Sequence, residues 1–207
     1  MPTLVLMSDT HGFHRDLVVP PGDILIHAGD LTQTGTLEEL ADVNAYFAGL
    51  PHPHKLVICG NHDFCFEREP ERARATLTAA TYLQDEAAQV LGIKVWGSPW
   101  QPWFYDWAFN LPRGPAIAGK WALIPMDTDI LVTHGPPFGI GDRTSHGDRA
   151  GCHDLLARIA VVRPKLHVFG HIHEGAGIYR QPGTTFVNAS TDECMGPVRV
   201  LAWPLED

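Results

Sequence analysis

The stretch Lys55-Leu56-Val57-Ile58-Cys59-Gly60-Asn61-His62-Asp63 joins a short apolar run to a polar tetrapeptide. The apolar half predicts a buried strand, so the polar half would follow the carboxyl end of that strand. Open α/β sheets usually bind ligands and carry out chemistry at the carboxyl ends of their strands. The stretch therefore predicts an α/β fold whose functional site includes Asn61, His62 and Asp63.

Four other segments repeat this arrangement of an apolar run followed by Asp or His. They are Ser8-Asp9-Thr10-His11, Gly29-Asp30, Thr133-His134-Gly135 and Gly170-His171-Ile172-His173. Any one of these histidines taken alone is more often an exposed or hydrogen-bonded residue than a ligand. Carboxylates and imidazoles are common metal ligands, however, and here they recur at the same place in several strands. The recurrence favours one shared metal centre over a set of unrelated turns.

The rest of the chain supplies the elements of a mixed fold. Apolar residues recur at helical spacing in residues 36–50, with Thr36 as the N-cap and Glu39 at the matching capping-box position. Further strands are predicted at residues 4–7, 24–28, 93–97, 129–133 and 166–169, and further helices at residues 69–81 and 151–162. Short β-type runs at residues 177–179, 185–188 and 198–203 suggest a second sheet.

Length and composition indicate a globular protein that can bury a sizeable core. With 207 residues and 44% hydrophobic side chains, we expect a single domain spanning residues 1–207. The net charge of −9 argues against extended nucleic-acid binding or an anionic membrane surface, since both depend on many Lys and Arg contacts. A small anionic substrate is compatible with this charge if metal ions supply a positive field.

Cysteine usage and the N-terminal sequence suggest a compartment. The 4 cysteines form no CxxC pair and no disulfide framework. The first residues lack a basic region followed by an apolar stretch and a cleavage site, and no run reaches the roughly 18 to 20 apolar residues that span a membrane. We therefore expect a soluble cytoplasmic protein with reduced thiols.

The motifs DxH, GD, GNHD, TH and GHxH, in this order between Asp9 and His173, resemble those of the calcineurin-like metallophosphoesterase superfamily. The resemblance implies an α/β fold in which two mixed β-sheets pack face to face between helices, an αββα sandwich. It also implies two divalent metal ions that share one bridging carboxylate. The ligands implied for the first ion are Asp9, His11, Asp30 and His173, and those for the second are Asp30, Asn61, His134 and His171.

The same resemblance implies a mechanism. Two divalent ions would bridge a phosphate ester and activate a bridging hydroxide, which attacks phosphorus in line. His62 resembles the general acid that protonates the leaving alkoxide, and Asp63 would orient its imidazole by a hydrogen bond. Mixed oxygen and nitrogen ligands suit several ions, of which we expect Mn²⁺, with Fe, Zn²⁺, Mg²⁺, Ni²⁺ or Co²⁺ as alternatives.

A closer resemblance is to the metallophosphoesterase domain-containing (MPPED) branch of that superfamily. It is carried by the GSPWQPW motif at residues 97–103, FNLPRG at residues 109–114, HGPP at residues 134–137 and the run at residues 163–175. This branch implies a phosphodiesterase of small phosphodiesters, with 2′,3′- or 3′,5′-cyclic nucleotides as natural candidates. Some animal members carry glycine where this sequence has His171, so we expect a complete two-metal centre here.

Three residues have two interpretations each. Trp100 belongs to an aromatic and proline-rich stretch, residues 98–114, that either shapes a substrate pocket or simply covers the core. Arg143 lies in a charged, glycine-rich loop, residues 135–151, where it either contacts substrate or is a solvated surface charge. His27 either supports the metal ligands or is an ordinary core histidine.

Two rival functions stay open. A phosphomonoesterase, or a nuclease that acts on nucleic-acid ends, would use the same metal centre. A non-catalytic scaffold would bind metal or nucleotide without turnover, although the presence of His62 and of every expected ligand speaks against it. The expected partner is a small-molecule phosphodiester, and the sequence predicts no particular oligomeric state.

Overall fold

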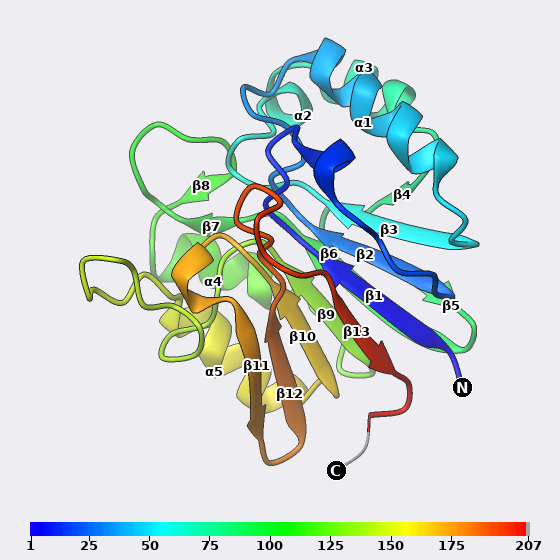
Figure 1. Cartoon of the computed structure of the whole chain (residues 1–207). Coiled ribbons are helices and arrows are strands. Elements are labelled where there is room, and N and C mark those ends of the chain that lie inside the picture. Colours follow the sequence, from blue (N-terminus) through cyan, green and yellow to red (C-terminus); the bar gives the residue numbers. More distant parts are fainter. Residues whose placement is uncertain (206–207) are drawn as a thin grey trace.

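The computed structural model describes residues 1–205 and contains two large β-sheets packed face to face, with helices on their outer faces (Figure 1). In Figure 1, α1 and α3 lie above the sheets, and α4 and α5 lie at the lower left. The fold class predicted from the sequence, an αββα sandwich, is confirmed.

The first sheet contains the amino-terminal strands. Its five strands lie in the order β13-β1-β2-β3-β4. Their bounds are Thr3–Met7 for β1, Ile24–Ala28 for β2, His54–Ile58 for β3, Thr81–Tyr82 for β4 and Arg199–Ala202 for β13. Strands β1 to β4 run parallel, whereas β13 pairs antiparallel with β1.

The second sheet has six strands in the order β11-β12-β10-β9-β6-β5. Their bounds are Glu86–Val90 for β5, Ile93–Ser98 for β6, Ile130–Thr133 for β9, Leu166–Phe169 for β10, Gly177–Gln181 for β11 and Thr184–Asn188 for β12. The four inner strands run parallel, and β5 and β11 are antiparallel edges. A separate pair joins β7 (Gln101–Pro102) to β8 (Asn110–Leu111).

Helices cover the outer faces of the two large sheets. Their bounds are Leu37–Gly49 for α1, Cys65–Arg68 for α2, Pro70–Thr76 for α3, Pro115–Trp121 for α4 and His153–Val162 for α5, with 3₁₀ turns at His14–Asp16 (η1) and His173–Gly175 (η2). Helix α1 packs on the first sheet through Val43 and Phe47. Helix α5 packs on the second sheet through Leu155 and Ile159.

Strand β1 shows why the apolar runs are continuous. Its Leu4 and Leu6 enter the core between the two sheets, and its Val5 and Met7 face the helix layer. Alternate residues of a strand point to opposite faces, so a strand that is buried on both faces needs apolar residues throughout. This double burial explains the Val, Ile and Leu runs that precede the polar motifs.

The start of α1 follows the predicted capping box. The backbone N–H of Glu39 donates to the Thr36 hydroxyl at 3.1 Å, and the Thr36 N–H donates to the Glu39 carboxylate at 3.1 Å. Both contacts satisfy N–H groups that a helix end leaves without partners.

Several elements differ from the sequence-based expectations, and three of them show why. The strand expected at residues 198–203 pairs with β1 in the first sheet, not with the second sheet. The helix expected at residues 69–81 ends at Thr76, and Thr81–Tyr82 forms β4. Helix α4 was not predicted, although its buried Ile117 and Trp121 have helical spacing. Among the helices of residues 1–205, none is long and apolar enough to cross a membrane.

Candidate metal centre

The turns after five parallel strands meet at one edge of the sandwich. Strands β1, β2 and β3 run parallel in the first sheet, and β9 and β10 run parallel in the second. The Asp30 carboxylate after β2 lies 3.3 Å from the imidazole of His134 after β9. The Asp9 carboxylate after β1 lies 3.6 Å from the imidazole of His173, which follows β10. The structure therefore brings together side chains from both sheets.

Four of these side chains stand on backbone in the left-handed region. The φ angle is 58° at Asp9, 45° at His11, 56° at Asp30 and 68° at His171. Residues other than glycine rarely adopt such angles, which cost of order 1 to 3 kcal/mol each, and they cluster at functional sites. Their concentration in three turns at one edge indicates that this edge is built for a function and not only for packing.

Two glycines let the turns approach the carboxylates closely. A Cβ atom on Gly60 would collide with the carboxylate of Asp30, and a Cβ atom on Gly170 would collide with that of Asp9. Glycine has no Cβ, so the backbone of one turn can lie directly against a side chain from another.

The first group of potential ligands contains Asp9, His11 and His173, whose ligand atoms lie within 4.8 Å of one another. The backbone N–H of His171 lies 3.1 Å from each carboxylate oxygen of Asp9 and donates to them. On the far side of the His173 ring, Nδ1 lies 3.0 Å from a carboxylate oxygen of Asp192. These contacts fix the orientation of Asp9 and His173.

The second group contains Asp30, His134 and His171, again within 4.8 Å. The Nε2 atom of His134 lies 3.0 Å from the amide oxygen of Asn61, which adds a neutral oxygen to the group. The Nδ1–H of His134 donates to the carbonyl oxygen of Ala28 at 2.9 Å. That bond directs Nε2 into the centre of the group.

Asp30 connects the two groups. Its Oδ2 atom lies 3.3 Å from Nε2 of His134 and 3.7 Å from Nε2 of His11, which belongs to the first group. Its Oδ1 atom accepts the backbone N–H of His62 at 2.8 Å. The side chains of His11, Asp30 and His62 form a third group with ligand atoms within 4.8 Å.

The donor set fits divalent metal ions. Carboxylate oxygens, imidazole nitrogens and an amide oxygen are the ligands that Mn²⁺, Fe and Zn²⁺ accept. The Nδ1 atom of His11 is buried and has no hydrogen-bond partner within residues 1–205. Buried acids and imidazoles cost free energy unless they are paired or coordinate a metal. The groups around Asp30 therefore match the residue types, burial and proximity of a metal centre.

Mutual pairing shifts the proton affinities of these side chains when no metal is bound. Burial alone would lower the pKa of His134, but the charge of Asp30 outweighs it and raises the pKa to about 9. The hydrogen bond to Asp9 raises the pKa of His173 to about 9 as well. Burial would raise the pKa of Asp30, yet His134 and His11 hold that pKa far below its ordinary value. These shifts favour the protonated imidazoles of His134 and His173.

His62 is oriented by a different residue from the one expected. Its Nδ1–H donates to the carbonyl oxygen of Gln33 at 2.7 Å. The Asp63 carboxylate is fully buried, and it accepts the backbone N–H of Gly60 at 2.8 Å, that of Thr32 at 3.0 Å and the Thr32 hydroxyl at 2.7 Å. The expectation that Asp63 orients His62 is wrong, because the two side chains leave the turn in different directions. Asp63 instead ties the turn after β3 to the turn after β2.

Aromatic contacts complete the surroundings of His62. Its ring packs on Trp107 with 4.4 Å between the ring centroids, and it meets the edge of the His11 ring at 4.5 Å. Sequence reasoning singled out neither Trp107 nor Gln33. The aromatic stretch at residues 98–114 was the only signal for Trp107.

Buried polar residues support the turns that carry the candidate ligands. His27 pairs through Nε2 with the hydroxyl of Thr10 at 3.0 Å, and Thr10 lies between Asp9 and His11. His27 thus contacts the ligand-bearing turn, the first of its two interpretations. Asn188 contacts the turn that carries His171 and His173, since its side-chain amide donates to the carbonyl oxygen of Ile172 at 2.8 Å.

The two expected substrate-binding residues make other contacts in the structure. The indole N–H of Trp100 donates to Asp85 at 3.0 Å, and the Lys120 ammonium lies 4.4 Å from the centroid of the Trp100 ring. These contacts make Trp100 part of the packing beneath the loop. Arg143 is exposed and forms a backbone bridge with Arg149. Substrate contact remains a prediction for both residues.

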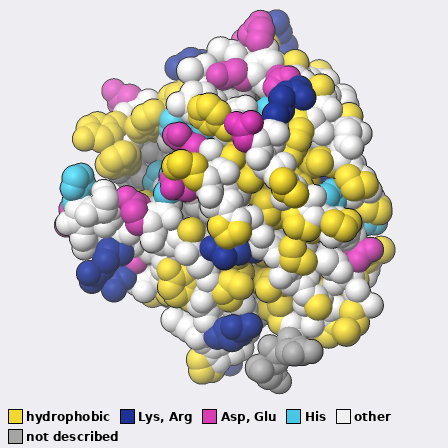
Figure 2. Space-filling model, in the orientation of Figure 1, with side chains coloured by type: hydrophobic (Ala, Val, Ile, Leu, Met, Phe, Trp, Pro, Cys, Tyr) yellow, Lys and Arg dark blue, Asp and Glu magenta, His cyan; other side chains and the backbone are white. Residues whose placement is uncertain are grey.

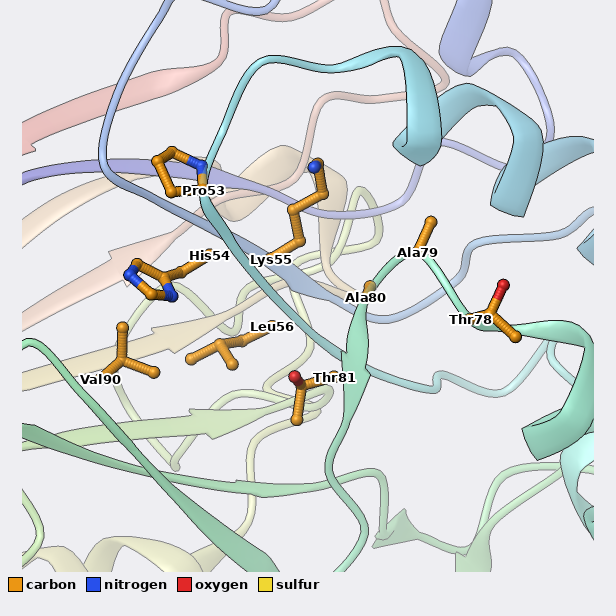
Figure 3. A pocket seen from close by; sticks show the side chains of 9 residues that line it. All are labelled: Pro53, His54, Lys55, Leu56, Thr78, Ala79, Ala80, Thr81 and Val90. Atoms are coloured by element: carbon orange, nitrogen blue, oxygen red, sulfur yellow. The ribbon is translucent and has the colours of Figure 1, made fainter.

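Cavities lie at both ends of the sheets, but their chemistry differs. At the carboxyl edge, a cavity of about 440 Å³ is lined by His171, His173, Glu174 and Asp192. At the amino end of β3, a cavity of about 200 Å³ is lined by residues such as His54, Lys55 and Thr81 (Figure 3). The candidate ligands all follow the carboxyl ends, so the cavity in Figure 3 is separate from them.

Comparisons with known proteins agree with this geometry. Residues 2–175 match the family model described as Calcineurin-like phosphoesterase. Metallophosphoesterase domain-containing protein 1 of Homo sapiens and that of Mus musculus are each 44% identical to this chain over 90% of its length. The match covers 65% of each relative, so the chain spans just under two thirds of their length.

Solved structures share the fold. The protein TT1561 of Thermus thermophilus superposes with a TM-score of 0.64 at 14% identity, covering 96% of this chain and 97% of that one. A structure titled as that of a novel archaeal phosphodiesterase gives a TM-score of 0.50 at 15% identity, covering 97% and 93%.

The raised pKa values predict proton release on metal binding. Imidazoles must be neutral to ligate, so Mn²⁺ binding to chelator-treated protein at neutral pH should displace about two protons, from His134 and His173. The release should fall, and the affinity should rise, as the pH approaches 9, the value to which both pKa values are raised. Calorimetric titrations in buffers of different ionisation enthalpy measure the number of protons released on Mn²⁺ binding. Binding without proton release would contradict the assignment.

Proposed function

Because this chain belongs to the calcineurin-like phosphoesterase family, in its metallophosphoesterase domain-containing branch, we propose that it is a metal-dependent phosphodiesterase of small phosphodiesters. Cyclic nucleotides, 2′,3′ or 3′,5′, are the first candidate substrates. The observation that carries the proposal is the sharing of Asp30 between two groups of potential ligands. The core common to both sheets supports treating residues 1–207 as one phosphoesterase domain.

Two divalent ions would be held at the carboxyl edge, with Mn²⁺ the first candidate. The proposed ligands are Asp9, His11, Asp30 and His173 for one ion and Asp30, Asn61, His134 and His171 for the other. Such ions would neutralise the charge of a phosphate ester and lower the pKa of the attacking water molecule. The chain's own contribution is positioning: the Ala28 carbonyl orients His134, and Asp192 orients His173.

His62 is the proposed general acid for the leaving alkoxide. Its Nδ1–H is engaged by the carbonyl oxygen of Gln33, and its ring is held between Trp107 and His11. The remaining nitrogen, Nε2, is left for the substrate. His62 is partly exposed beside the buried Asp30, as a proton donor to a bound ester needs to be.

The same residues and the net charge of the chain also bear on the rival functions. A scaffold that binds metal without turnover would need the donor set but not the histidine beside it. A nuclease that binds long strands would carry a basic surface, whereas this chain has a net charge of −9. A phosphomonoesterase would use the same centre, and the substrate assay below separates it from a diesterase.

The first test is turnover by the purified full chain loaded with Mn²⁺. Bis-p-nitrophenyl phosphate should be hydrolysed, and 2′,3′-cyclic AMP or 3′,5′-cyclic AMP should be hydrolysed faster than AMP or a short oligonucleotide. Faster hydrolysis of AMP would favour the phosphomonoesterase. Stoichiometric metal binding without any turnover would favour the scaffold.

His62→Ala should separate proton donation from metal binding. We expect unchanged metal content and a rate loss of about 10² to 10⁴ for an alkyl ester, which needs a proton on its leaving group. A p-nitrophenyl ester should slow much less, because p-nitrophenolate leaves without a proton. Metal analysis and kcat/KM for the two esters measure these effects.

His54→Ala provides the matched control, since His54 lines the separate cavity of Figure 3. It should leave both rates and the metal content as they are. Equal slowing of the alkyl and p-nitrophenyl esters by His62→Ala would remove the support for a general acid.

A further inference from the structure

An apolar cavity opens directly beside the candidate metal centre. Its volume is about 260 Å³, and its apolar walls are Pro102, Trp103, Phe104, Pro136 and Ile172. His171, a proposed ligand, also lines it, so the cavity and the metal centre are continuous. Figure 2 shows hydrophobic side chains gathered over the loop between β7 and β8, beside a hollow with histidine side chains at its edge.

The two aromatic residues are available to a ligand. Trp103 is 59% exposed and Phe104 is 55% exposed, although both side chains are large and apolar. Single exposed hydrophobic residues are common on protein surfaces, but a cluster beside a cavity with polar groups at one end is typical of a binding site. A cavity of about 150 Å³ already holds a benzene ring, so this one has room for a planar ring system.

The backbone holds this aromatic wall in place. The N–H of Trp103 donates to the carbonyl oxygen of Leu111 at 2.9 Å, which extends the pairing of β7 with β8. The side-chain amide of Asn110 donates to the carbonyl oxygens of Phe104 at 3.2 Å and Tyr105 at 2.9 Å. The exposure of these rings therefore follows from a fixed loop, and the site is largely formed before a ligand arrives.

Another part of the cavity wall is fixed by an arginine, Arg113. The guanidinium of Arg113 donates to the carbonyl oxygens of Gly151 at 2.8 Å and Ala150 at 2.9 Å. Both carbonyls belong to the loop that follows Gly135 and returns to α5. These Arg113 donors are therefore occupied by the loop, and the cavity offers a bound group mainly apolar contacts.

His171 lines the cavity whereas His62 does not, and the two histidines belong to different groups of potential ligands around Asp30. His171 groups with Asp30 and His134, whereas His62 groups with Asp30 and His11. A leaving group that takes a proton from His62 would therefore lie away from His171. The substituent that stays on phosphorus is the one that can reach the apolar cavity.

We propose that this cavity binds a flat ring on the retained substituent of a phosphodiester, with Trp103 and Phe104 determining this specificity. The proposal rests on the phosphodiesterase function proposed above. Hydrolysis breaks the bond between phosphorus and the leaving oxygen, which gains a proton, while water supplies the new oxygen on phosphorus. The retained ring stays against Trp103 throughout. The preferred substrates are thus diesters with an aromatic or nucleobase-bearing retained group, not simple dialkyl esters.

The test compares phenyl p-nitrophenyl phosphate with methyl p-nitrophenyl phosphate on Mn²⁺-loaded protein. Both esters release p-nitrophenolate, so they differ only in the retained group. The readout is kcat/KM for the phenyl ester divided by kcat/KM for the methyl ester. Nonproductive binding of the p-nitrophenyl ring lowers kcat and KM by the same factor, so it leaves kcat/KM unchanged. Trp103→Ala should lower the phenyl-to-methyl ratio by about 10-fold, since stacking on an aromatic side chain is worth about this much.

Tyr105→Ala is the matched control. Tyr105 is the neighbouring aromatic residue of the same loop and is 72% exposed; its ring contacts that of Phe104 at 4.5 Å between centroids, but Tyr105 itself does not line the cavity. It should leave the phenyl-to-methyl ratio at the wild-type value. An unchanged ratio in Trp103→Ala, or an equal fall in Tyr105→Ala, would overturn the proposal while leaving the phosphodiesterase function intact.

A binding measurement separates this proposal from the failure of the proposed function. Phenylphosphonate and methylphosphonate cannot be hydrolysed as esters, and calorimetry gives their affinities for the Mn²⁺-loaded full chain whether or not any ester is turned over. The wild type should bind phenylphosphonate more tightly, and Trp103→Ala should weaken this binding by about 10-fold. Equal affinity of the wild type for both phosphonates would contradict the cavity's role, even if both esters are hydrolysed.

Discussion

The buried carboxylate of Asp30 is the feature on which the candidate centre depends. It is only 2% exposed, and it lies where the turn after β2 meets those after β3 and β9. One oxygen accepts the N–H of His62, and the other faces His11 and His134. A buried charge without such partners would cost several kcal/mol. The contacts of one side chain therefore bind the carboxyl edges of two sheets together and connect the two groups of potential ligands.

The surrounding residues arrange the proposed ligands and the proposed general acid before any ion or substrate arrives. His134 is held by a backbone carbonyl, His173 by Asp192 and His62 by the carbonyl of Gln33. Such outer contacts fix which ring nitrogen faces inward and are a large part of what tunes a metal site. The left-handed backbone at Asp30 and in the neighbouring turns is strained. The packed sheets that carry these turns hold the backbone in this conformation.

The sequence predicted the meeting of the strand ends because apolar runs followed by Asp or His recur, and parallel strands end at one edge. It did not predict contacts made across long separations. Gln33 orients His62 from 29 residues away, whereas the adjacent Asp63 points into the interior. Trp100 and Trp103 belong to one aromatic stretch, yet the pairing of β7 with β8 places Trp100 in the packing and Trp103 at a cavity. No local pattern distinguishes two such tryptophans.

The central claim is that two metal ions share Asp30. Anomalous diffraction at the manganese edge from crystals of the Mn²⁺-loaded protein tests it most directly. The account predicts two peaks on either side of the Asp30 carboxylate, one beside His11 and His173 and the other beside His134 and His171. A single peak, or peaks away from Asp30, would contradict it.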